Sequence, residues 1–325
     1  MVSIQTQETI KELTNNTLEG KVLLITGGTG SFGQKFTEIA LQRNPKAIRI
    51  FSRGEFLQSE MTRKFNDDRL RFFIGDIRDR DRLHRASQGV DLIVHAAALK
   101  QVPSCEYNPI EAVKTNVGGV INIIDAAIDT GVEKVIAISS DKAVQSLNLY
   151  GSTKAVMEKL VVQANSYTGG KKPIFSCVRY GNVTASRGSI ADLFTNYVKQ
   201  GAEKLPITDL RMTRFWMSIE QGVNFVLNCI SMMRGGEIFV PKIGSSKVIE
   251  MVDKLFGLPT EIVGIRPGEK LHEVLISEDE ARHTREFEDY FVIIPEHPFW
   301  TEDRYLDETG EKLPEGFTYS SKKET

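Results

Sequence analysis

The sequence predicts an α/β fold: a doubly wound parallel sheet with a second, smaller α/β region towards the C-terminus. Short apolar runs rich in β-branched residues alternate with helical stretches through the first half of the chain. These runs are continuously apolar, as is typical of strands buried on both faces of a sheet. A glycine-rich turn joins the first run to the first helical stretch, which also favours a strand–helix–strand unit.

Each element follows from its local pattern. The expected strands are Val22–Thr26, Ala47–Ser52, Arg71–Ile74, Leu92–His95 and Val135–Ser139. The expected helices between and after them are Phe32–Arg43, Glu111–Thr130 and Lys154–Ala164. After Tyr180 the alternation gives way to loops that contain Gly, Arg and Pro, although Met217–Met233 is expected as a helix and Glu237–Pro241 as a strand.

Composition excludes several classes of partner. The 325 residues suffice for one large or two modest domains. A net charge of −2 and a pI near 6.3 argue against binding to nucleic acid or to an anionic membrane. Three scattered cysteines without Cys-x-x-Cys spacing suit a reducing compartment. With no signal-peptide pattern and no run long enough to span a bilayer, we expect a soluble cytoplasmic protein.

The turn at residues 26–33 reads TGGTGSFG, with glycines in Gly-x-x-Gly-x-x-Gly spacing. It follows a strand and opens a helix, where backbone N–H groups can bind a pyrophosphate. We therefore expect a dinucleotide at this turn. The residues expected to bind it are Gly27, Gly28, Thr29, Gly30, Ser31, Phe32 and Gly33.

The end of the second strand bears on the choice between NADP and NAD. Ser52 and Arg53 stand where an acidic residue would bind a ribose 2′-hydroxyl. A hydroxyl and a guanidinium suit a 2′-phosphate, so NADP is favoured. Glu55, two residues further on, could still take the part of the acid and permit NAD.

Two further strand ends complete the expected cofactor site. Asp76 and Ile77 follow the third strand, and Asp76 is either close to the adenine or a solvent-facing loop residue. The fourth strand is followed by small residues beginning at Ala96, which would let the cofactor lie close. His95 itself is interpreted as a core histidine.

Residues 139–154, SSDKAVQSLNLYGSTK, carry two acid/base sets. Tyr150 and Lys154 are four apart and project from one face of a helix. A lysine cation beside a phenol lowers the pKa of the phenol, which makes it a general base. The same spacing at Tyr167 and Tyr319 lies in a glycine-bearing stretch and in a polar tail, so Tyr150 is the candidate.

The second set, Ser140-Asp141-Lys142, lies ten residues before Tyr150. A simple dehydrogenase needs only one such set. Without further context, Asp141 and Lys142 would be interpreted as a surface ion pair. The five histidines lack the spacing of metal ligands, so no metal is expected.

The motifs together resemble a known family. In order along the chain they are TGGTGSFG, GDIRD, HAAALKQVPSCEYNP, TNV, SSDKA, NLYGSTK, RYGNV, SRGS, ITDLRMTRFW, GGEIFVPKI and IRPGEKLHE. From about Val22 to Trp300 the chain is similar to the soluble UDP-N-acetylglucosamine (UDP-GlcNAc) 4,6-dehydratases of the extended short-chain dehydrogenase/reductase superfamily, in particular the inverting type that begins pseudaminic acid biosynthesis. Departures are Gln101, where such enzymes usually have His, and Gln145-Ser146, which replace an Asn-Pro-like pair.

The resemblance implies a Rossmann-like fold and an NADP-dependent dehydration of UDP-GlcNAc, in which C4 oxidation acidifies the C5 hydrogen. Tyr150 would take the C4-hydroxyl proton, and Lys154 would stabilise the phenolate and hold the nicotinamide ribose. Ser140 would hydrogen-bond the C4 oxygen. Lys142 would remove the C5 proton and Asp141 would protonate the departing 6-hydroxyl. Burial and the positive nicotinamide are expected to favour a neutral Lys142, and burial is expected to keep Asp141 protonated.

Substrate contacts are also implied by the resemblance. Lys100 would contact both cofactor and substrate, and the other expected substrate contacts are Asn182, Arg187, Arg214, Arg266 and Glu269. The arginines would surround the uridine diphosphate, because a guanidinium matches phosphate oxygens bidentately. Each arginine alone could equally be a solvated surface residue.

The resemblance also implies a homo-oligomer built from dimers, with a hexamer as one form. We expect a polar extension over residues 1–20, an NADP-binding Rossmann domain over 21–181 to which 213–242 return, and a UDP-sugar domain over 182–212 and 243–325. Three alternatives remain: a retaining dehydratase, a UDP-sugar 4-epimerase, and a regulator that binds NADP without turnover.

Overall fold

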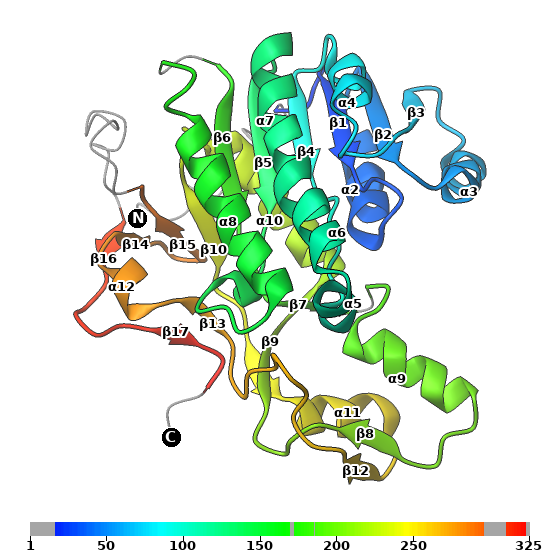
Figure 1. The fold of residues 1–325 in the computed structure, drawn as a ribbon, viewed down its shortest axis with the longest axis vertical. Helices are drawn as coiled ribbons and strands as arrows, with labels where there is room; N and C mark the ends of the chain where they lie inside the picture. Colours follow the sequence, from blue (N-terminus) through cyan, green and yellow to red (C-terminus); the bar gives the residue numbers. More distant parts are fainter. Residues whose placement is uncertain (1–16, 170–171, 185, 296–309, 323–325) are drawn as a thin grey trace, which may run out of the picture.

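We describe residues 17–169, 172–184, 186–295 and 310–322 of a computed structural model. Most of the extension expected at residues 1–20 lies outside these ranges. The main body is a ten-stranded sheet in the order β16-β14-β15-β10-β6-β5-β4-β1-β2-β3 (Figure 1). Its strands are β1 Val22–Thr26, β2 Ala47–Ser52, β3 Leu70–Ile74, β4 Leu92–His95, β5 Lys134–Ile138, β6 Ile174–Val178, β10 Ile238–Pro241, β14 Thr284–Glu286, β15 Tyr290–Ile293 and β16 Glu311–Lys312.

The pairing from β3 to β10 is parallel throughout, and β15, β14 and β16 extend it as antiparallel strands. The predicted doubly wound parallel sheet is therefore confirmed. The five expected strands differ from the observed ones by at most one residue at an end. Because β1 pairs with both β2 and β4, the strand order reverses there, and such a reversal opens a crevice at the carboxyl ends of the strands.

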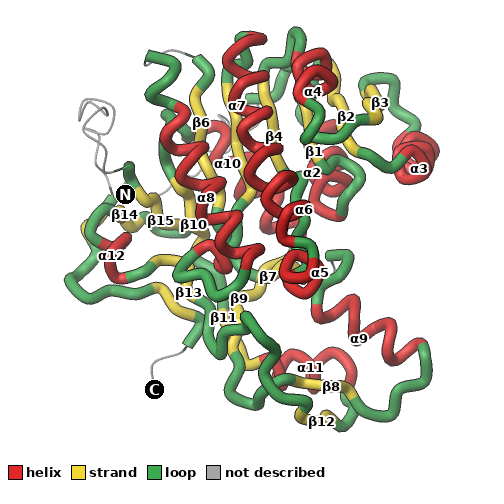
Figure 2. The backbone as a smooth tube through the Cα atoms, viewed as in Figure 1, coloured by secondary structure: helices red, strands yellow, loops and turns green. Residues whose placement is uncertain are grey.

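Helices cover both faces of the sheet, as the tube in Figure 2 shows. On one face lie α4 Arg80–Ser87, α7 Gly119–Thr130 and α8 Leu149–Ala164. On the other lie α2 Ser31–Leu41 and α10 Ile219–Met232, and α3 Glu55–Phe65 lies beyond β3. The sequence predicts helices for α2, α8 and α10, and α8 begins before Lys154 because Asn148 caps it at Leu149.

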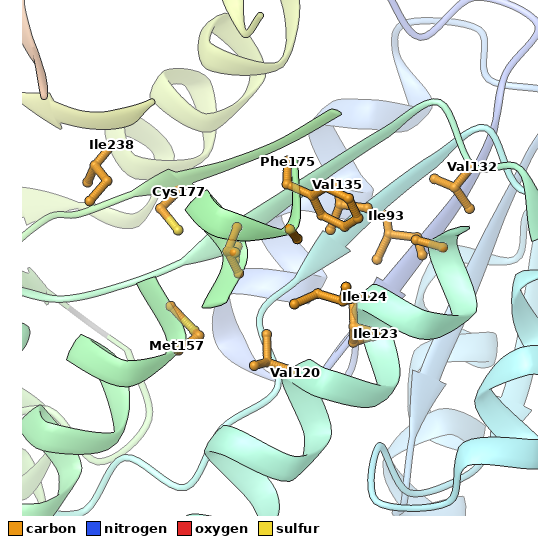
Figure 3. Packing of buried hydrophobic residues seen from close by; sticks show 14 of the residues in the cluster. Ile93, Val120, Ile123, Ile124, Val132, Val135, Met157, Phe175, Cys177 and Ile238 are labelled. Carbon is orange, nitrogen blue, oxygen red and sulfur yellow. The ribbon is translucent and has the colours of Figure 1, made fainter. Parts of the chain in front are cut away.

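Two apolar layers hold this body together, one on each face of the sheet. In the first, Ile123 of α7 and Met157 of α8 pack over Val135 and Phe175 of the central strands (Figure 3). Each such fully buried side chain contributes about 1.5–3 kcal/mol. The layers therefore fix the ends of the strands, from which the loops of the crevice emerge.

The expected helix Glu111–Thr130 is interrupted. It is observed as α6 Pro109–Val113, a π-helical turn at Lys114–Gly118, and α7. In this turn the Asn116 amide accepts a hydrogen bond from Leu99 N and donates to Leu99 O, both at 2.8 Å. Insertions of this kind in helices are common at functional sites. Here the insertion ties the loop after β4 to the helix, just before Lys100.

A smaller lobe lies below the carboxyl ends of the strands in the view of Figure 1. It contains α9 Ile190–Lys199, α11 Val248–Phe256 and the strands β7 Asn182–Thr184, β8 Leu205–Ile207, β9 Thr213–Ser218, β11 Ser245–Lys247 and β12 Thr260–Ile262. A separate apolar cluster around Phe194 and Val252 forms its core. The remaining elements are α5 Val102–Tyr107, a 3₁₀ turn at Asp141–Ala143, β13 Val274–Ile276, α12 Glu278–Ala281 and β17 Tyr319–Ser320.

The expected grouping of residues 243–325 with the substrate region needs correction. Strands β14, β15 and β16 hydrogen-bond into the main sheet beside β10. The reason is that β10 would otherwise be an edge strand with unpaired backbone groups. Residues 213–242 are expected to return to the Rossmann domain. Within this range β10 joins the main sheet, whereas β9 pairs with β7 and β11 in the smaller lobe.

Candidate active site

One cavity of about 950 Å³ lies between the glycine-rich turn and the smaller lobe. Its volume suits a large organic ligand. The sequence-predicted site residues that line it are Gly27, Thr29, Gly30, Ser31, Phe32, Gly33, Ser52, Arg53, Asp76, Ile77, Ala96, Lys100, Ser140, Lys142, Tyr150, Lys154, Asn182, Arg187, Arg214, Arg266 and Glu269. Of the predicted set, Gly28 and Asp141 do not line it.

The glycine-rich turn is too tight for larger residues. Gly27 has φ +68°, and a Cβ there would lie 2.9 Å from the Ala97 backbone. A Cβ on Gly33 would lie 2.5 Å from the backbone of Gly28. Helix α2 begins at Ser31 without a side-chain cap, so N–H groups of its first turn remain for a ligand. These residues fit a dinucleotide pyrophosphate.

The end of β2 presents a cation to the cavity. Arg53 lines the cavity and lies 3.8 Å from Asp76, which is also paired with Arg78 at 2.7 Å. Burial raises the pKa of Asp76, but the two arginines outweigh it, so the pKa is lowered. The Ser52 hydroxyl accepts a hydrogen bond from Gln58 at 3.0 Å. A cationic and hydroxylic wall therefore stands where the 2′-position of a bound ribose is expected.

His95 is a core residue, as the sequence predicts. Its Nδ1 lies 2.8 Å from the Thr26 hydroxyl, and its side chain is buried. Burial, with the nearby Lys154 cation, lowers its pKa to about 3. His95 therefore stays neutral and joins the ends of β1 and β4 beneath the glycine-rich turn.

Tyr150 and Lys154 both reach the cavity from the first turns of α8. Burial raises the pKa of Tyr150 to about 12, against the lowering effects of Lys142 and of a hydrogen bond with Ser140. Lys154 donates instead to the Ile138 carbonyl at 2.7 Å, and burial lowers its pKa to about 8. The expectation that Lys154 lowers the pKa of Tyr150 is thus wrong here: the cation that acts on the phenol is Lys142.

The second acid/base set forms a buried ion pair. Asp141 Oδ1 accepts hydrogen bonds from the Ser140 hydroxyl at 2.8 Å and from Lys142 Nζ at 3.1 Å. Burial lowers the pKa of Lys142, but Asp141 and Glu273 outweigh it, and the net pKa is raised. With these two carboxylates beside it, Lys142 is an ammonium in this structure, and the neutral form expected beside a positive nicotinamide stays a prediction. The interpretation of Asp141 and Lys142 as a surface ion pair is wrong, because Asp141 is fully buried.

Sequence reasoning missed two charged residues of this cluster. Glu273 Oε1 lies 3.5 Å from Lys142 Nζ, and Lys270 Nζ lies 3.9 Å from Glu273 Oε2. Lys270 also donates to the Val144 carbonyl. Both residues belong to the IRPGEKLHE motif, which could have indicated them. Their burial against Lys142, however, depends on a contact between distant parts of the chain.

The expected substrate residues separate into three places. Arg187 donates to the Thr29 carbonyl at 3.1 Å, and its backbone N–H donates to Ser31 Oγ at 2.9 Å, so it lies at the glycine-rich turn. Arg214 is buried 3.8 Å from Glu273.

Arg266 is exposed at the rim of the cavity, in a turn closed by the hydrogen bond from Glu269 N to Arg266 O. Asn182 on β7 and Lys100 line the cavity between these places, and burial lowers the pKa of Lys100.

Within the residues that the structure describes, no group of three or more His, Cys, Asp or Glu side chains is arranged to hold a metal ion. None of the helices described has the length and apolar character needed to cross a bilayer.

Comparisons with known proteins agree with this geometry. The family model described as polysaccharide biosynthesis protein matches residues 23–295. The inverting UDP-GlcNAc 4,6-dehydratase of Campylobacter jejuni is 50% identical over 93% of this chain and 92% of its own. A UDP-glucose 4-epimerase of Rickettsia canadensis is 44% identical over 84% of this chain and 82% of its own.

Two solved structures share the fold. Pen from Bacillus thuringiensis superposes with a TM-score of 0.87 at 36% identity, covering 94% of both chains. DesIV, a dTDP-glucose 4,6-dehydratase from Streptomyces venezuelae solved with NAD and TYD bound, gives 0.70 at 25% identity over 77% of this chain and 86% of its own. By its motifs, its sheet and these relatives, the chain belongs to the polysaccharide biosynthesis protein family, in the part of the extended short-chain dehydrogenase/reductase superfamily that includes the inverting UDP-GlcNAc 4,6-dehydratases.

Proposed function

We propose that this protein is an NADP-dependent UDP-GlcNAc 4,6-dehydratase that inverts C5. Its product would be a UDP-2-acetamido-2,6-dideoxy-hexos-4-ulose. The observation that carries the proposal is the placement of Lys142, paired with the buried Asp141, beside Tyr150 in one cavity wall. An epimerase has no step that needs this second acid/base set. The name of the Campylobacter jejuni relative supports the same reaction.

A bound nicotinamide dinucleotide would accept a hydride from C4 of the sugar and return it to C6. The glycine-rich turn and the open first turn of α2 would hold its pyrophosphate, with Arg187 closing over the turn. Ser52 and Arg53 support NADP, because a guanidinium pairs with a 2′-phosphate. The NAD bound to the dTDP-glucose dehydratase supports the cofactor class.

Tyr150 would take the C4-hydroxyl proton, and the nearby Lys142 cation supports the phenolate against burial. The ketone at C4 acidifies the C5 hydrogen, which Lys142 would remove after its own proton has passed to Asp141, 3.1 Å away. Asp141 does not line the cavity, so this proton would reach the departing 6-hydroxyl through the Ser140 hydroxyl, which lies 2.8 Å from Asp141 Oδ1. Lys154 would hold the nicotinamide ribose.

The uridine diphosphate would bind along the smaller lobe. Arg214 and Arg266 would pair with its phosphates, and Lys100 and Asn182 would contact the sugar. Glu269 would act through the turn that presents Arg266. Residues 182–212 and the part of 243–283 that lies in this lobe would form the UDP-sugar region.

The setting of the reaction is also part of the proposal. We infer a cytoplasmic location, supported by three buried free cysteines, and a place at the start of pseudaminic acid biosynthesis. A homo-oligomer is supported by exposed apolar side chains on α5, α6 and α7, among them Tyr107, Ile110 and Ile121. Light scattering after gel filtration should give a multiple of the 36.4 kDa chain mass; a monomer at all concentrations would exclude the oligomer.

The test is incubation of the purified protein with UDP-GlcNAc in D₂O, without added cofactor, followed by NMR and mass spectrometry. We expect loss of one water and deuterium at C5, with ring couplings of the inverted sugar. Couplings of the uninverted sugar would indicate a retaining dehydratase. The Rickettsia canadensis relative favours an epimerase as the second candidate, which would leave the mass of the sugar unchanged. An untouched sugar with retained NADP would indicate a regulator.

A further inference from the structure

Glu273 is a buried carboxylate in the cavity wall to which the mechanism above assigns no role. Its Oε1 lies 3.5 Å from Lys142 Nζ and 3.8 Å from Arg214 Nε. Its Oε2 is buried and, among the described residues, has no hydrogen-bond partner. A buried carboxylate without full compensation is costly, so its presence needs an explanation.

The backbone of Glu273 is held firmly by the C-terminal segment. Its N–H donates to Ser321 Oγ at 2.8 Å, and its carbonyl accepts from Ser321 N at 2.8 Å. Ser321 Oγ lies 2.8 Å from the Thr213 hydroxyl, one residue before Arg214. Pairing of β13 with β17 continues this attachment. The carboxylate is therefore carried by a rigid element and faces Lys142 in a defined place.

The charges that face Lys142 come from every element packed around it. Asp141 lies in the same turn, Tyr150 comes from α8, and Arg214 comes from β9. Lys270 and Glu273 come from the segment before β13. Without Glu273, Asp141 would be the carboxylate left among the described residues to face Lys142 and Lys270.

We propose that Glu273 is a positioning residue of the active site, whose carboxylate is the second counter-ion of Lys142 and holds the Lys142 ammonium between Asp141 and the cavity. The inference rests on the proposed dehydratase function, in which Lys142 acts at C5. Two carboxylates within 3.1 and 3.5 Å of Nζ restrict its position more than one does. They also balance the two neighbouring cations, which would otherwise repel Nζ.

A pH dependence follows. Glu273 and Asp141 together raise the pKa of Lys142, against burial and Arg214. A lysine acts as a base only in its neutral form, so the rate of C5 deprotonation rises with pH through the pKa of Lys142. Removing the Glu273 charge lowers this pKa, so the rise should move to lower pH.

The test is Glu273→Gln, assayed with UDP-GlcNAc in D₂O across a pH series by turnover and by deuterium incorporation at C5. We expect the acid limb of the pH–rate profile to move down by about one pH unit, which is a tenfold change in the acid dissociation constant of Lys142. We also expect the maximal rate to fall about tenfold. Glu278→Gln is the matched control, because it removes an exposed carboxylate five positions away. It should leave the limb and the rate unchanged.

The Glu273→Asp variant separates the effect of the carboxylate charge from the effect of its distance to Lys142. It should restore the wild-type limb at a reduced rate, because the charge remains but is withdrawn by one methylene. If Glu273→Gln fails to fold by circular dichroism, Glu273→Asp decides: a rate loss near tenfold at an unchanged limb supports the proposal, and wild-type turnover overturns it. An active wild type with an unshifted Glu273→Gln limb overturns this inference alone. A wild type inert on UDP-GlcNAc overturns the proposed function, and the inference with it.

Discussion

Burial governs the acid–base chemistry of individual residues in this cavity more than sequence neighbours do. Tyr150 and Lys154 are one helical turn apart, yet desolvation moves their pKa values in opposite directions, to about 12 and about 8. Both neutral forms are favoured, as expected for groups removed from water. Lys142 departs from this pattern only because two carboxylates face it.

Replacement of Tyr150 by Phe should abolish C4 oxidation. The ring would keep its packing with Cys105 and Ala112, so the melting temperature should change little, while turnover should fall by about 10²–10⁴-fold, the contribution of a general base. In the wild type the oxidation rate should rise from neutral to alkaline pH, since the phenolate is needed and its pKa is raised. Stopped-flow absorbance of the reduced nicotinamide measures both. Undiminished reduction by the variant would rule out Tyr150 as the base.

Replacement of Arg53 by Ala should change which nucleotide the protein retains. Nucleotide released by heat from the purified wild type should be NADP by mass spectrometry, and the variant should release a larger share of NAD, because the partner of the 2′-phosphate is gone. Arg63→Ala, which removes an exposed arginine of α3, is the control. NAD in the wild type would contradict the preference for NADP.

At the scale of elements, α8 links the catalytic candidates to the substrate lobe through its cap. Asn148 Oδ1 accepts from Gly151 N at 2.8 Å, and Asn148 Nδ2 donates to Gly268 O at 2.8 Å. The same side chain therefore begins the helix that carries Tyr150 and holds the turn that carries Arg266. The helix cap uses Asn148 Oδ1 and the contact with the turn uses Asn148 Nδ2, so a substitution can separate the two roles.

Asn148→Ala should lower the free energy of unfolding by about 0.5–2 kcal/mol, the cost of losing an N-cap. It should also raise the KM for UDP-GlcNAc, because the turn at Gly268 is released. Asn148→Asp keeps the cap oxygen but cannot donate to Gly268, so its stability should stay near wild type while KM rises. Urea unfolding and steady-state kinetics test the pair. Equal KM values for wild type and Asn148→Asp would contradict the link.

At the scale of the whole molecule, Arg179 connects three elements that the sequence keeps far apart. It donates to both carboxylate oxygens of Glu158 on α8, at 2.9 and 2.7 Å, and to both of Glu280 on α12, at 3.0 and 2.8 Å. It also donates to Leu275 O on β13, two residues after Glu273, at 2.8 Å. Burial lowers the pKa of Arg179, but the two carboxylates outweigh it and raise it.

Arg179→Met should destabilise the protein by about 3–5 kcal/mol, because the buried Glu158 loses its partner. Arg282→Met is the control: its exposed pair with Asp279 at 3.5 Å should contribute about 0–1 kcal/mol. Burial raises the pKa of Glu280, but Arg179 outweighs it, so the net pKa lies below 4.5. The Glu280 contribution should thus persist above that pH and disappear as pH falls through the lowered value. Urea unfolding at pH 7 and pH 4 measures this. An equal loss of unfolding free energy in both variants would contradict the proposed role of Arg179 in joining Glu158 and Glu280.

Much of the fold could be predicted because its signals are local. Continuous apolar runs mark β1, β2, β4 and β5, and a glycine turn opening a helix marks the cofactor end of the cavity. The spacing of Tyr150 and Lys154 likewise predicts a shared helix face. The antiparallel strands β14–β16 escaped prediction, because such short strands are defined by their partner β10 and hardly by their own residues.

The candidate site shows the same division. The spacing of Tyr150 and Lys154 makes them candidates from the chain alone, whereas Ser140, Asp141 and Lys142 become candidates through the family resemblance. Only the folded structure decides which of these charges are buried and what they face. It directs Lys154 to the Ile138 carbonyl, sets Arg187 against the glycine turn and brings Glu273 to Lys142. Desolvation and Coulomb energy depend on distance in space, which a linear sequence does not contain.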